Sequence, residues 1–260
     1  MKTTNGKYQS QSNAAQALDF MTCFGKLIVI SLVMAFSTET QAQDSSKATL
    51  QIYPRLHSAG YFPFTGALLN HNPVADLNIF YERKAVGFFL FQSFDIKDRH
   101  SYANYFQPGV FATVKLHPTF KVRGFFGYIF AQTQRFRDAD SDYYAATTLY
   151  WDPAKHLSIQ NTVLFYDYNI QRKLANRLLV SVSYPKFKVD LFLWDRTVLV
   201  EKKQAISASL ALTFPIIKVG EKTSIQFTAA YMRYLTSYKP SFALDDGFVF
   251  TLGMPVNVKP

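Results

Sequence analysis

Apolar side chains occupy every second position along several stretches of the sequence. In 110–116 (VFATVKL) the even positions hold Val, Ala, Val and Leu, and the odd positions hold Phe, Thr and Lys. The same two-residue period runs through 187–196 (FKVDLFLWDR) and 203–214 (KQAISASLALTF). A period of two is typical of a β-strand, whose successive side chains point to opposite faces. These stretches are therefore predicted to be strands with one apolar face and one small, polar or aromatic face.

Connections of two kinds separate these strands and alternate along the chain. The short ones are 82–86, 116–120, 151–156, 184–187 and 214–223, and the longer, more polar ones are 95–104, 135–144, 167–176, 195–204 and 235–247. Outer-membrane barrels have short periplasmic turns and longer extracellular loops. In hydrocarbon, backbone amides must be paired within the protein, so a spanning sheet must close on itself. The alternation therefore predicts a closed membrane barrel.

The number of strands follows from the number of connections. Eleven strands run from about Pro73 to the C-terminus, and the stretch 48–69 supplies one more, which returns both ends to the periplasm. The predicted fold is all-β, a transmembrane antiparallel up-and-down β-barrel of about twelve strands. Pro54 and Pro63 interrupt the first stretch. A ten-strand barrel with part of that stretch inside the lumen is the alternative.

The N-terminal segment has the features of an export signal. Lys26 precedes an apolar run, Leu27 to Phe36, and small polar residues follow. A membrane-spanning helix needs about 20 apolar residues, so this run is too short and is predicted to be a signal peptide. Residues 1–42 are predicted to be the leader, with Met21 as an alternative start, and 43–260 a single barrel domain.

Composition supports a membrane location. The chain contains 25 Phe, 16 Tyr and 2 Trp, and aromatic rings favour the boundary between lipid tails and headgroups. Several aromatics lie where strands meet connections. The predicted interface aromatics are Tyr150, Trp151, Tyr166, Tyr168, Tyr231, Tyr234, Phe248 and Phe250. Outer-membrane lipid and lipopolysaccharide are the expected surroundings, and the sequence does not determine the oligomeric state. A soluble secreted β-barrel that binds a small ligand has the same alternation and stays an alternative.

Basic residues exceed acidic ones, with a net charge of +10 for the whole chain. They are spread along an exported protein, which argues against nucleic acid as a partner. A charge on the lipid face costs about 2 to 4 kcal/mol at midplane, so the charges are predicted to face inward. The predicted lumen-lining residues are Asp76, Glu82, Lys115, Lys121, Arg123, Arg135, Arg177, Lys188, Asp190, Arg196 and Lys203. These charges either plug the lumen by pairing or line a narrow, porin-like channel for small anionic solutes.

Two patterns raise the alternative of an outer-membrane hydrolase acting on lipid or peptide. His156 and Ser158 are two positions apart, and His100 lies among loop carboxylates that include Asp95 and Asp98. Paired carboxylates can activate water. The His156 pair lies beside a short turn, however, and solvated loops are commonly acidic. No catalytic residue, metal site or cofactor is therefore predicted.

The chain resembles small outer-membrane β-barrels of Bacteroidota-type bacteria. The resemblance rests on the leader ending TQAQDSS, the stretch 71–91 (HNPVADLNIFYERKAVGFFLF) and the repeated short-turn, long-loop order. It covers nearly the whole mature chain. It implies an outer-membrane location in a Gram-negative bacterium and a barrel architecture, and it implies no substrate.

Overall fold

The protein is a closed antiparallel β-barrel. The computed structural model describes residues 48–62, 66–99, 101–131, 142–167, 172–219, 223–239 and 243–258. Its spanning strands are β1 (Thr49–His57), β4 (Val74–Arg83), β5 (Val86–Asp95), β6 (Tyr105–His117), β7 (Phe120–Ala131), β8 (Asp142–Ala154), β9 (Leu157–Tyr166), β10 (Lys173–Tyr184), β11 (Phe187–Val198), β12 (Lys203–Lys218), β13 (Ser224–Tyr234) and β14 (Asp246–Gly253), which β15 (Val256–Val258) continues. The predicted twelve-strand up-and-down barrel is confirmed. Among the described residues no helix is long and apolar enough to cross a membrane.

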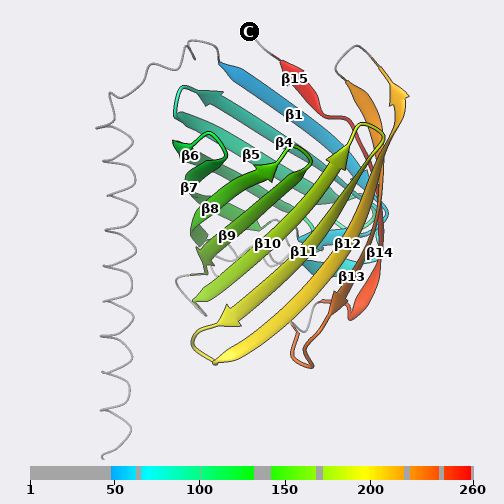
Figure 1. Ribbon diagram of the computed structural model, residues 1–260. Helices are drawn as coiled ribbons and strands as arrows, with labels where there is room; N and C mark the ends of the chain where they lie inside the picture. The colour runs from blue at the N-terminus through cyan, green and yellow to red at the C-terminus, as the bar shows by residue number, and fades with distance from the viewer. Residues whose placement is uncertain are drawn as a thin grey trace, which may run out of the picture. The chain divides into compact units, whose positions relative to one another are not determined.

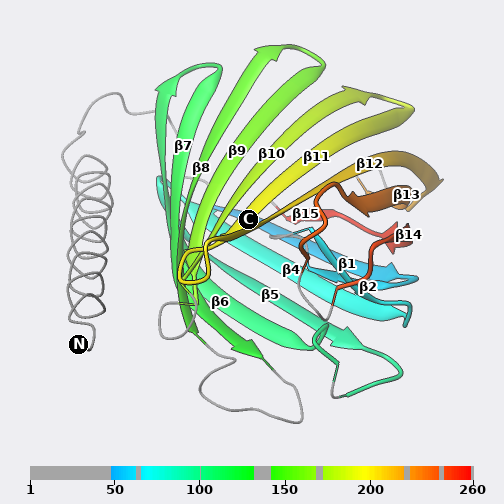
Figure 2. The ribbon, with the colours of Figure 1, turned by 90° about the horizontal axis from the view of Figure 1, so that it is seen from below.

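The barrel closes between its first and last strands. β14 pairs with β13 on one side and with β1 on the other, and β15 extends the contact with β1 (Figures 1 and 2). All other spanning strands pair with their neighbours in the chain. Closure matters because it leaves no sheet edge with unpaired backbone groups.

The two rims of the barrel differ in their connections. One rim, which we call the turn end, carries connections 84–85, 118–119, 155–156, 185–186 and 219–223, and both ends of the described chain lie there (Figure 1). The opposite rim, the loop end, carries 58–73, 96–104, 132–141, 167–172, 199–202 and 235–245. The predicted long loop 195–204 is wrong in extent, because β11 continues to Val198 and β12 begins at Lys203. Arg196 and Lys203 continue these strands because the inner face accepts their charges.

Side chains alternate between the two faces of the sheet as the sequence pattern predicts. In β11, Phe187, Leu191 and Leu193 are exposed, whereas Asp190 and Trp194 are buried. The exposed outer surface is largely Leu, Ile, Val and Phe. This outer surface is suited to hydrocarbon, and the inner face carries the polar and charged side chains.

Part of the stretch 48–69 lies inside the barrel and does not belong to the barrel wall. After β1, the strands β2 (Gly60–Phe62) and β3 (Ala67–Asn70) pair with each other in a separate two-stranded sheet. Leu68 of this hairpin packs with Trp194, Met232 and Val249 of the inner face. The structure therefore has both features, twelve spanning strands and a segment inside the lumen. The sequence predicts such an inward segment only for the ten-strand alternative.

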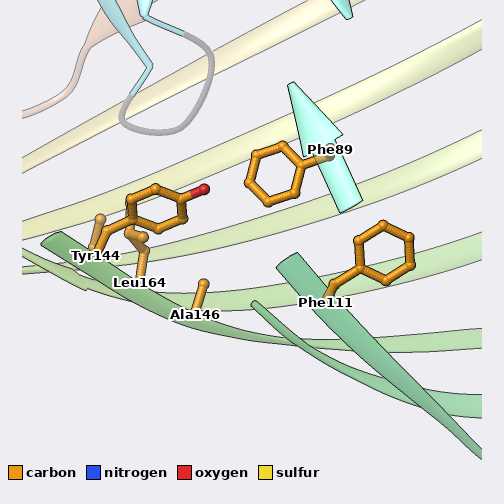
Figure 3. Close-up of a cluster of buried hydrophobic side chains, with 6 residues drawn as sticks. Phe89, Phe111, Tyr144, Ala146 and Leu164 are labelled. Carbon is orange, nitrogen blue, oxygen red and sulfur yellow. The ribbon is translucent and has the colours of Figure 1, made fainter. Parts of the chain in front are cut away.

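A second apolar cluster lies inside the lumen on a different part of the wall. It consists of Phe89, Phe111, Tyr144, Ala146, Leu164 and Ala175, all on the inner face of β5 to β10 (Figure 3). Phe89 meets Phe125 edge-on, with ring centroids 5.4 Å apart. Aromatic side chains are thus an internal filling of this barrel as well as an outer surface.

Three of the predicted interface aromatics face the lumen instead. Tyr150 lies beneath the Lys121 ammonium, Tyr166 packs against the aromatic cluster, and Tyr234 pairs in register with inner-face Ser207. Consecutive residues of a strand point to opposite faces, so only one of Tyr150 and Trp151 can meet lipid. Trp151, Tyr231, Phe248 and Phe250 are exposed on the outer face, and Tyr168 lies outside the described residues.

Candidate functional site

A polar row crosses the inner face from β6 to β10. The register aligns Thr113 with Arg123, Arg123 with Thr148, Thr148 with Thr162, and Thr162 with Arg177. Aligned residues on neighbouring strands share a face, and three strand spacings separate the two arginines by about 14 Å along the sheet. The next row toward the loop end is Phe111, Phe125, Ala146, Leu164 and Ala175. A cationic band therefore borders an apolar one.

Hydrogen bonds and ring contacts hold the arginines of this row in place. The Arg123 guanidinium donates to Glu82 Oε2 and Thr113 Oγ1, both at 2.8 Å, and its Cζ lies 4.4 Å from the centre of the Phe111 ring. Arg177 donates to Thr162 Oγ1 at 3.3 Å. Stacking on an aromatic face leaves part of the planar guanidinium edge available for other acceptors.

A cavity of about 300 Å³ lies against this row. Its lining combines aromatic rings, neutral hydrogen-bonding groups and three arginines: Gln51, Arg55, Asn78, Phe80, Phe89, Phe91, Arg123, Phe125, Tyr144, Ala146, Thr148, Tyr150, Gln160, Thr162, Leu164 and Arg177. None of these described lining side chains carries a carboxylate. Glu82 and Asp76 contact Arg123 and Arg55 without lining the cavity. The charged groups that line the cavity are therefore all cations, and carboxylates outside the lining pair with two of them, Arg55 and Arg123.

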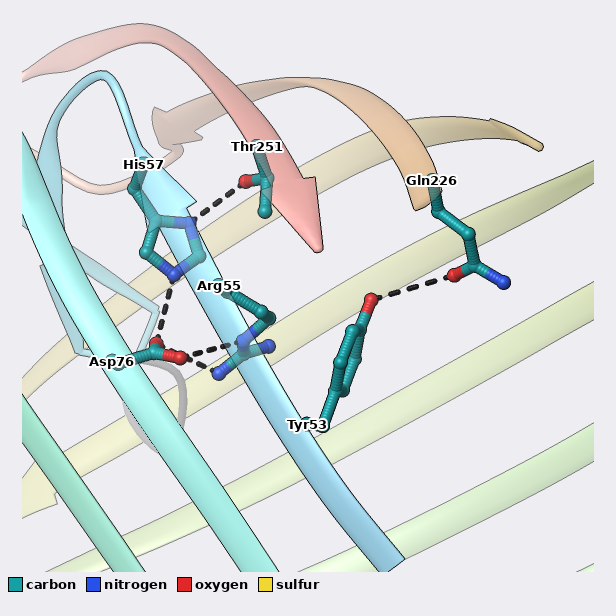
Figure 4. A network of polar contacts seen from close by, with 6 residues as sticks. All are labelled: Tyr53, Arg55, His57, Asp76, Gln226 and Thr251. Carbon is teal, nitrogen blue, oxygen red and sulfur yellow. Dashed lines mark hydrogen bonds and ion pairs between the residues drawn. The ribbon is translucent and has the colours of Figure 1, made fainter. Parts of the chain in front are cut away.

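Arg55 belongs to a buried network across the closure of the barrel. Its guanidinium makes two 2.8 Å hydrogen bonds to the Asp76 carboxylate (Figure 4). His57 Nε2 lies 2.8 Å from Asp76 Oδ2, and His57 Nδ1 lies 2.8 Å from Thr251 Oγ1 (Figure 4). These residues come from β1, β4 and β14. The network therefore links the first spanning strand to both of its neighbours.

The order of hydroxyl, imidazole and carboxylate in this network is that of a hydrolase triad. Two observations favour a structural role. The His57 side chain is only 1% exposed, so a substrate has no access to it. Asp76 is also bound by Arg55, which fixes the carboxylate between a guanidinium and an imidazole. Buried polar groups satisfied in this way stabilise one particular arrangement of strands.

The predicted lumen residues are distributed along the inner face. Ten of the eleven lie within the described chain: Asp76, Glu82, Lys115, Lys121, Arg123, Arg177, Lys188, Asp190, Arg196 and Lys203, whereas Arg135 lies outside it. The register places each of the ten on the face that the aromatic cluster and the cavity share. Only Arg123 and Arg177 line the cavity. Asp190 binds Lys188 and Ser181, and Lys203 pairs with Glu201 at the loop end.

Sequence reasoning missed Arg55, the third arginine of the cavity. In 50–57 (LQIYPRLH), Leu50, Ile52 and Leu56 alternate with Tyr53 and Arg55. Pro54 is on the outer side of this strand. Because proline has no backbone N–H, its presence argued against a continuous strand through this stretch. Pro54 is tolerated because it lies in the gap between the residues of β1 that pair with β14 and those that pair with β15. The two-residue period on either side of Pro54 was the available signal.

The predicted hydrolase residues are not grouped together. His156 lies in the turn before β9, where its Nδ1 donates a 2.8 Å hydrogen bond to the Ser183 carbonyl and its ring stacks on Tyr184. Ser158 pairs in register with inner-face Ser181. Asp95 accepts hydrogen bonds from Asn70, Asn72 and two backbone amides. His100 lies outside the described residues. Within the described chain no group of three His, Cys, Asp or Glu residues could hold a metal ion.

Comparison with known proteins establishes the fold class. No family model and no curated protein matches the sequence. Solved structures do match. The NanC porin has a TM-score of 0.53 and 14% identity over 79% of this chain and 98% of its own. An outer-membrane channel from Pseudomonas putida F1 has a TM-score of 0.53 and 9% identity over 85% and 100%.

The KdgM porin, in a structure described as a complex with disordered oligogalacturonate, has a TM-score of 0.51 and 8% identity over 80% of this chain and 97% of its own. Identities this low show a shared fold and nothing finer. The protein has the β-barrel fold of outer-membrane porins.

Proposed function

We propose that the protein is an integral outer-membrane channel that admits small anionic solutes and binds them weakly in its lumen. The observation that carries this proposal is the cavity lined by Arg55, Arg123 and Arg177 and, among the described residues, by no carboxylate. A ring of cations lowers the barrier for anions and raises it for cations. Arginine is suited to this task because it stays charged and binds carboxylate or phosphate through two N–H groups.

Access to this cavity is better from the turn end than from the loop end. Gln51 and Lys115, on the inner face toward the turn end, are exposed, whereas Gln107 and Tyr105 toward the loop end are almost completely buried. Lys121 lies on the same accessible side, above the Tyr150 ring. Cations near the turn end would raise the local concentration of anions before they reach the arginines.

The lining also restricts the kind of anion. Phe80, Phe89 and Phe125 offer ring faces, and Gln160, Thr148 and Thr162 offer neutral hydrogen-bonding groups. An organic carboxylate that carries hydroxyl groups uses all three kinds of surface, whereas chloride uses only the charge. Binding of oligogalacturonate by the KdgM porin, an anionic saccharide in a barrel of the same fold, is consistent with this class of solute.

Single-channel recording in planar bilayers tests the proposal. The mature protein is expected to carry a chloride current that galacturonate reduces in a concentration-dependent way, because the sugar acid occupies the cavity. Galactose, a neutral sugar of similar size, should reduce the current much less. Equal effects of the two sugars would contradict a charge-based site.

A matched pair of variants locates the site. Arg177→Gln removes a cation that lines the cavity, and Lys188→Gln removes an inner-face cation that does not line it. Block by galacturonate should weaken several-fold in the first variant and stay near the wild-type value in the second. Equal weakening in both would indicate only a general effect of net charge.

The remaining parts of the proposal concern location. We propose that residues 1–42 are removed as a signal peptide on export, and that the protein lies in the outer membrane of a Gram-negative bacterium of the Bacteroidota type. The apolar outer face of the barrel and the general resemblance of the sequence support this assignment. Fractionation of the envelope, with N-terminal sequencing of the mature protein, is the corresponding test.

A further inference from the structure

The connection between β1 and β4, the first two spanning strands, is longer than the geometry of the sheet requires. β1 ends at His57 and β4 begins at Val74, and these two residues are direct cross-strand partners. Two residues are enough to join such partners in an antiparallel hairpin. The chain instead inserts residues 58–73, whose described parts include β2 and β3 inside the barrel. Because this insertion is not needed to connect the two strands, we expect it to have another role.

The hairpin β2–β3 packs tightly against one wall of the lumen. Ala59 and Leu68 belong to an apolar cluster with Trp194, Met232 and Val249. At Gly66, which has a φ of 64°, a Cβ atom would lie 2.3 Å from the Trp194 ring. At Gly66 there is therefore no room for a side chain between the backbone and this wall.

Hydrogen bonds fix the hairpin at two further places. Asn70 Nδ2 donates to Asp95 Oδ2 at 2.8 Å and to Ser101 Oγ at 2.7 Å. The backbone N–H of Leu244 donates to the Leu68 carbonyl at 2.8 Å. The hairpin is thereby held to the end of β5, to connection 96–104 and to connection 235–245 at once.

We propose that the β2–β3 hairpin is a fixed internal constriction that sets the upper size of solutes crossing the barrel. This inference rests on the proposed channel function. The hairpin packs on inner-face residues of β11, β13 and β14, and the aromatic cluster of Phe89, Phe111 and Tyr144 lies on the inner face of other strands, β5, β6 and β8. A twelve-strand barrel is wider than the eight-strand barrels that side chains alone can fill. The hairpin supplies the extra filling, so the passage is narrower than the strand number alone would give.

Replacing the hairpin tests this role directly. In the test variant, a two-residue Asn-Gly turn joins His57 to Val74 in place of residues 58–73. The full mature protein and this variant are reconstituted into liposomes, and swelling is measured with neutral sugars of increasing size, so that charge does not contribute. The variant is expected to admit larger sugars and to show a several-fold higher single-channel conductance. An unchanged size limit and conductance would overturn the proposal.

Two point variants decide the question if the replacement fails to show the heat-dependent gel shift of a folded barrel. Leu68→Ala loosens the packing of the hairpin against Trp194, Tyr61→Ala shortens a partly buried hairpin side chain, and each should raise the conductance modestly. Val200→Ala is the matched control, because Val200 is exposed in connection 199–202 at the same rim. No rise in Leu68→Ala and Tyr61→Ala relative to Val200→Ala would overturn the proposal.

The two proposals fail in different ways. A replacement variant that conducts while the native protein does not would support the constriction and contradict an open native channel. A native protein that is anion-selective, with a replacement variant of identical size limit, would overturn the constriction alone.

Discussion

The two halves of the lumen are built from the same strands but have different interiors. Toward the loop end, inner-face Ser93, Tyr105, Gln107 and Ser207 are each no more than 2% exposed. Toward the turn end, Lys115 and Ser183 are exposed, and Lys121 and Gln160 are half-buried. The half toward the loop end, the packed half, is therefore more tightly filled, and the half toward the turn end, the accessible half, opens on the basic cavity.

This difference shows how a barrel of fixed strand number can combine stability with access for a solute. The packed half carries the network that links β1, β4 and β14 at the closure of the sheet. The accessible half keeps arginines in positions set by Thr113, Thr162 and Glu82. Changes in the first half should therefore act mainly on stability, and changes in the second mainly on conduction.

Asp76→Asn should have the largest effect on stability. Asp76 is buried between Arg55 and His57, and removal of one partner from a buried charge pair typically costs about 3 to 5 kcal/mol. The gel shift that distinguishes folded from unfolded barrel should then occur at a clearly lower temperature. Glu82→Gln is the matched control, since the Arg123–Glu82 pair lies in the accessible half and is partly exposed. Equal losses in both variants would contradict the contrast between the halves.

Gly66→Ala should have the next largest effect. A non-glycine residue at positive φ costs about 1 to 3 kcal/mol, and the new methyl group would also collide with the Trp194 ring. We expect the hairpin to loosen while the spanning strands stay paired. Conductance should rise and protease sensitivity within 58–73 should increase, with the gel shift retained. A gel shift and conductance identical to those of the native protein would argue against close packing of the hairpin.

Arg177→Gln should change selectivity more than stability. The residue lines the cavity, and glutamine keeps a hydrogen-bond donor near Thr162 while removing the charge. The ratio of chloride to potassium permeability should fall several-fold, as measured from the reversal potential in a salt gradient. An unaltered ratio would show that the arginine row does not control the passage of ions.

The double variant Lys115→Gln, Lys121→Gln should have the smallest effect. These two cations pair in register near the turn end, where water and salt screen them. The loss of anion selectivity should be modest at low ionic strength and should disappear above about 1 M salt, where the screening length is about 3 Å. A loss as large as that of Arg177→Gln, or one that salt does not change, would place the selective step at the turn end.

Much of the fold could be predicted because alternation is a local property of the chain. Stretches such as 187–196 and 203–214 fix which side chains share a face, and closure of the sheet follows from the absence of water in the membrane. The inward positions of Arg123, Arg177 and Asp190 follow from the same rule.

What could not be predicted depends on contacts between distant segments. The inner hairpin is recognisable only when Leu68 is seen to pack with Trp194 and Val249, which are far away in the sequence. Whether Tyr150 and Tyr166 point into the lumen or toward lipid depends on the register of whole strands. The aromatic character of a residue does not by itself indicate the face on which it lies. The partners of Arg55 come from β4, and no local pattern in β1 indicates them.

The measurement that tests the account most directly is the reversal potential of the mature protein in a planar bilayer with a potassium chloride gradient. The arginine-lined cavity predicts a reversal potential with the sign of anion selectivity, and the selectivity should decrease in Arg177→Gln. A potential with the sign of cation selectivity, or a folded barrel that carries no current, would contradict the proposed function.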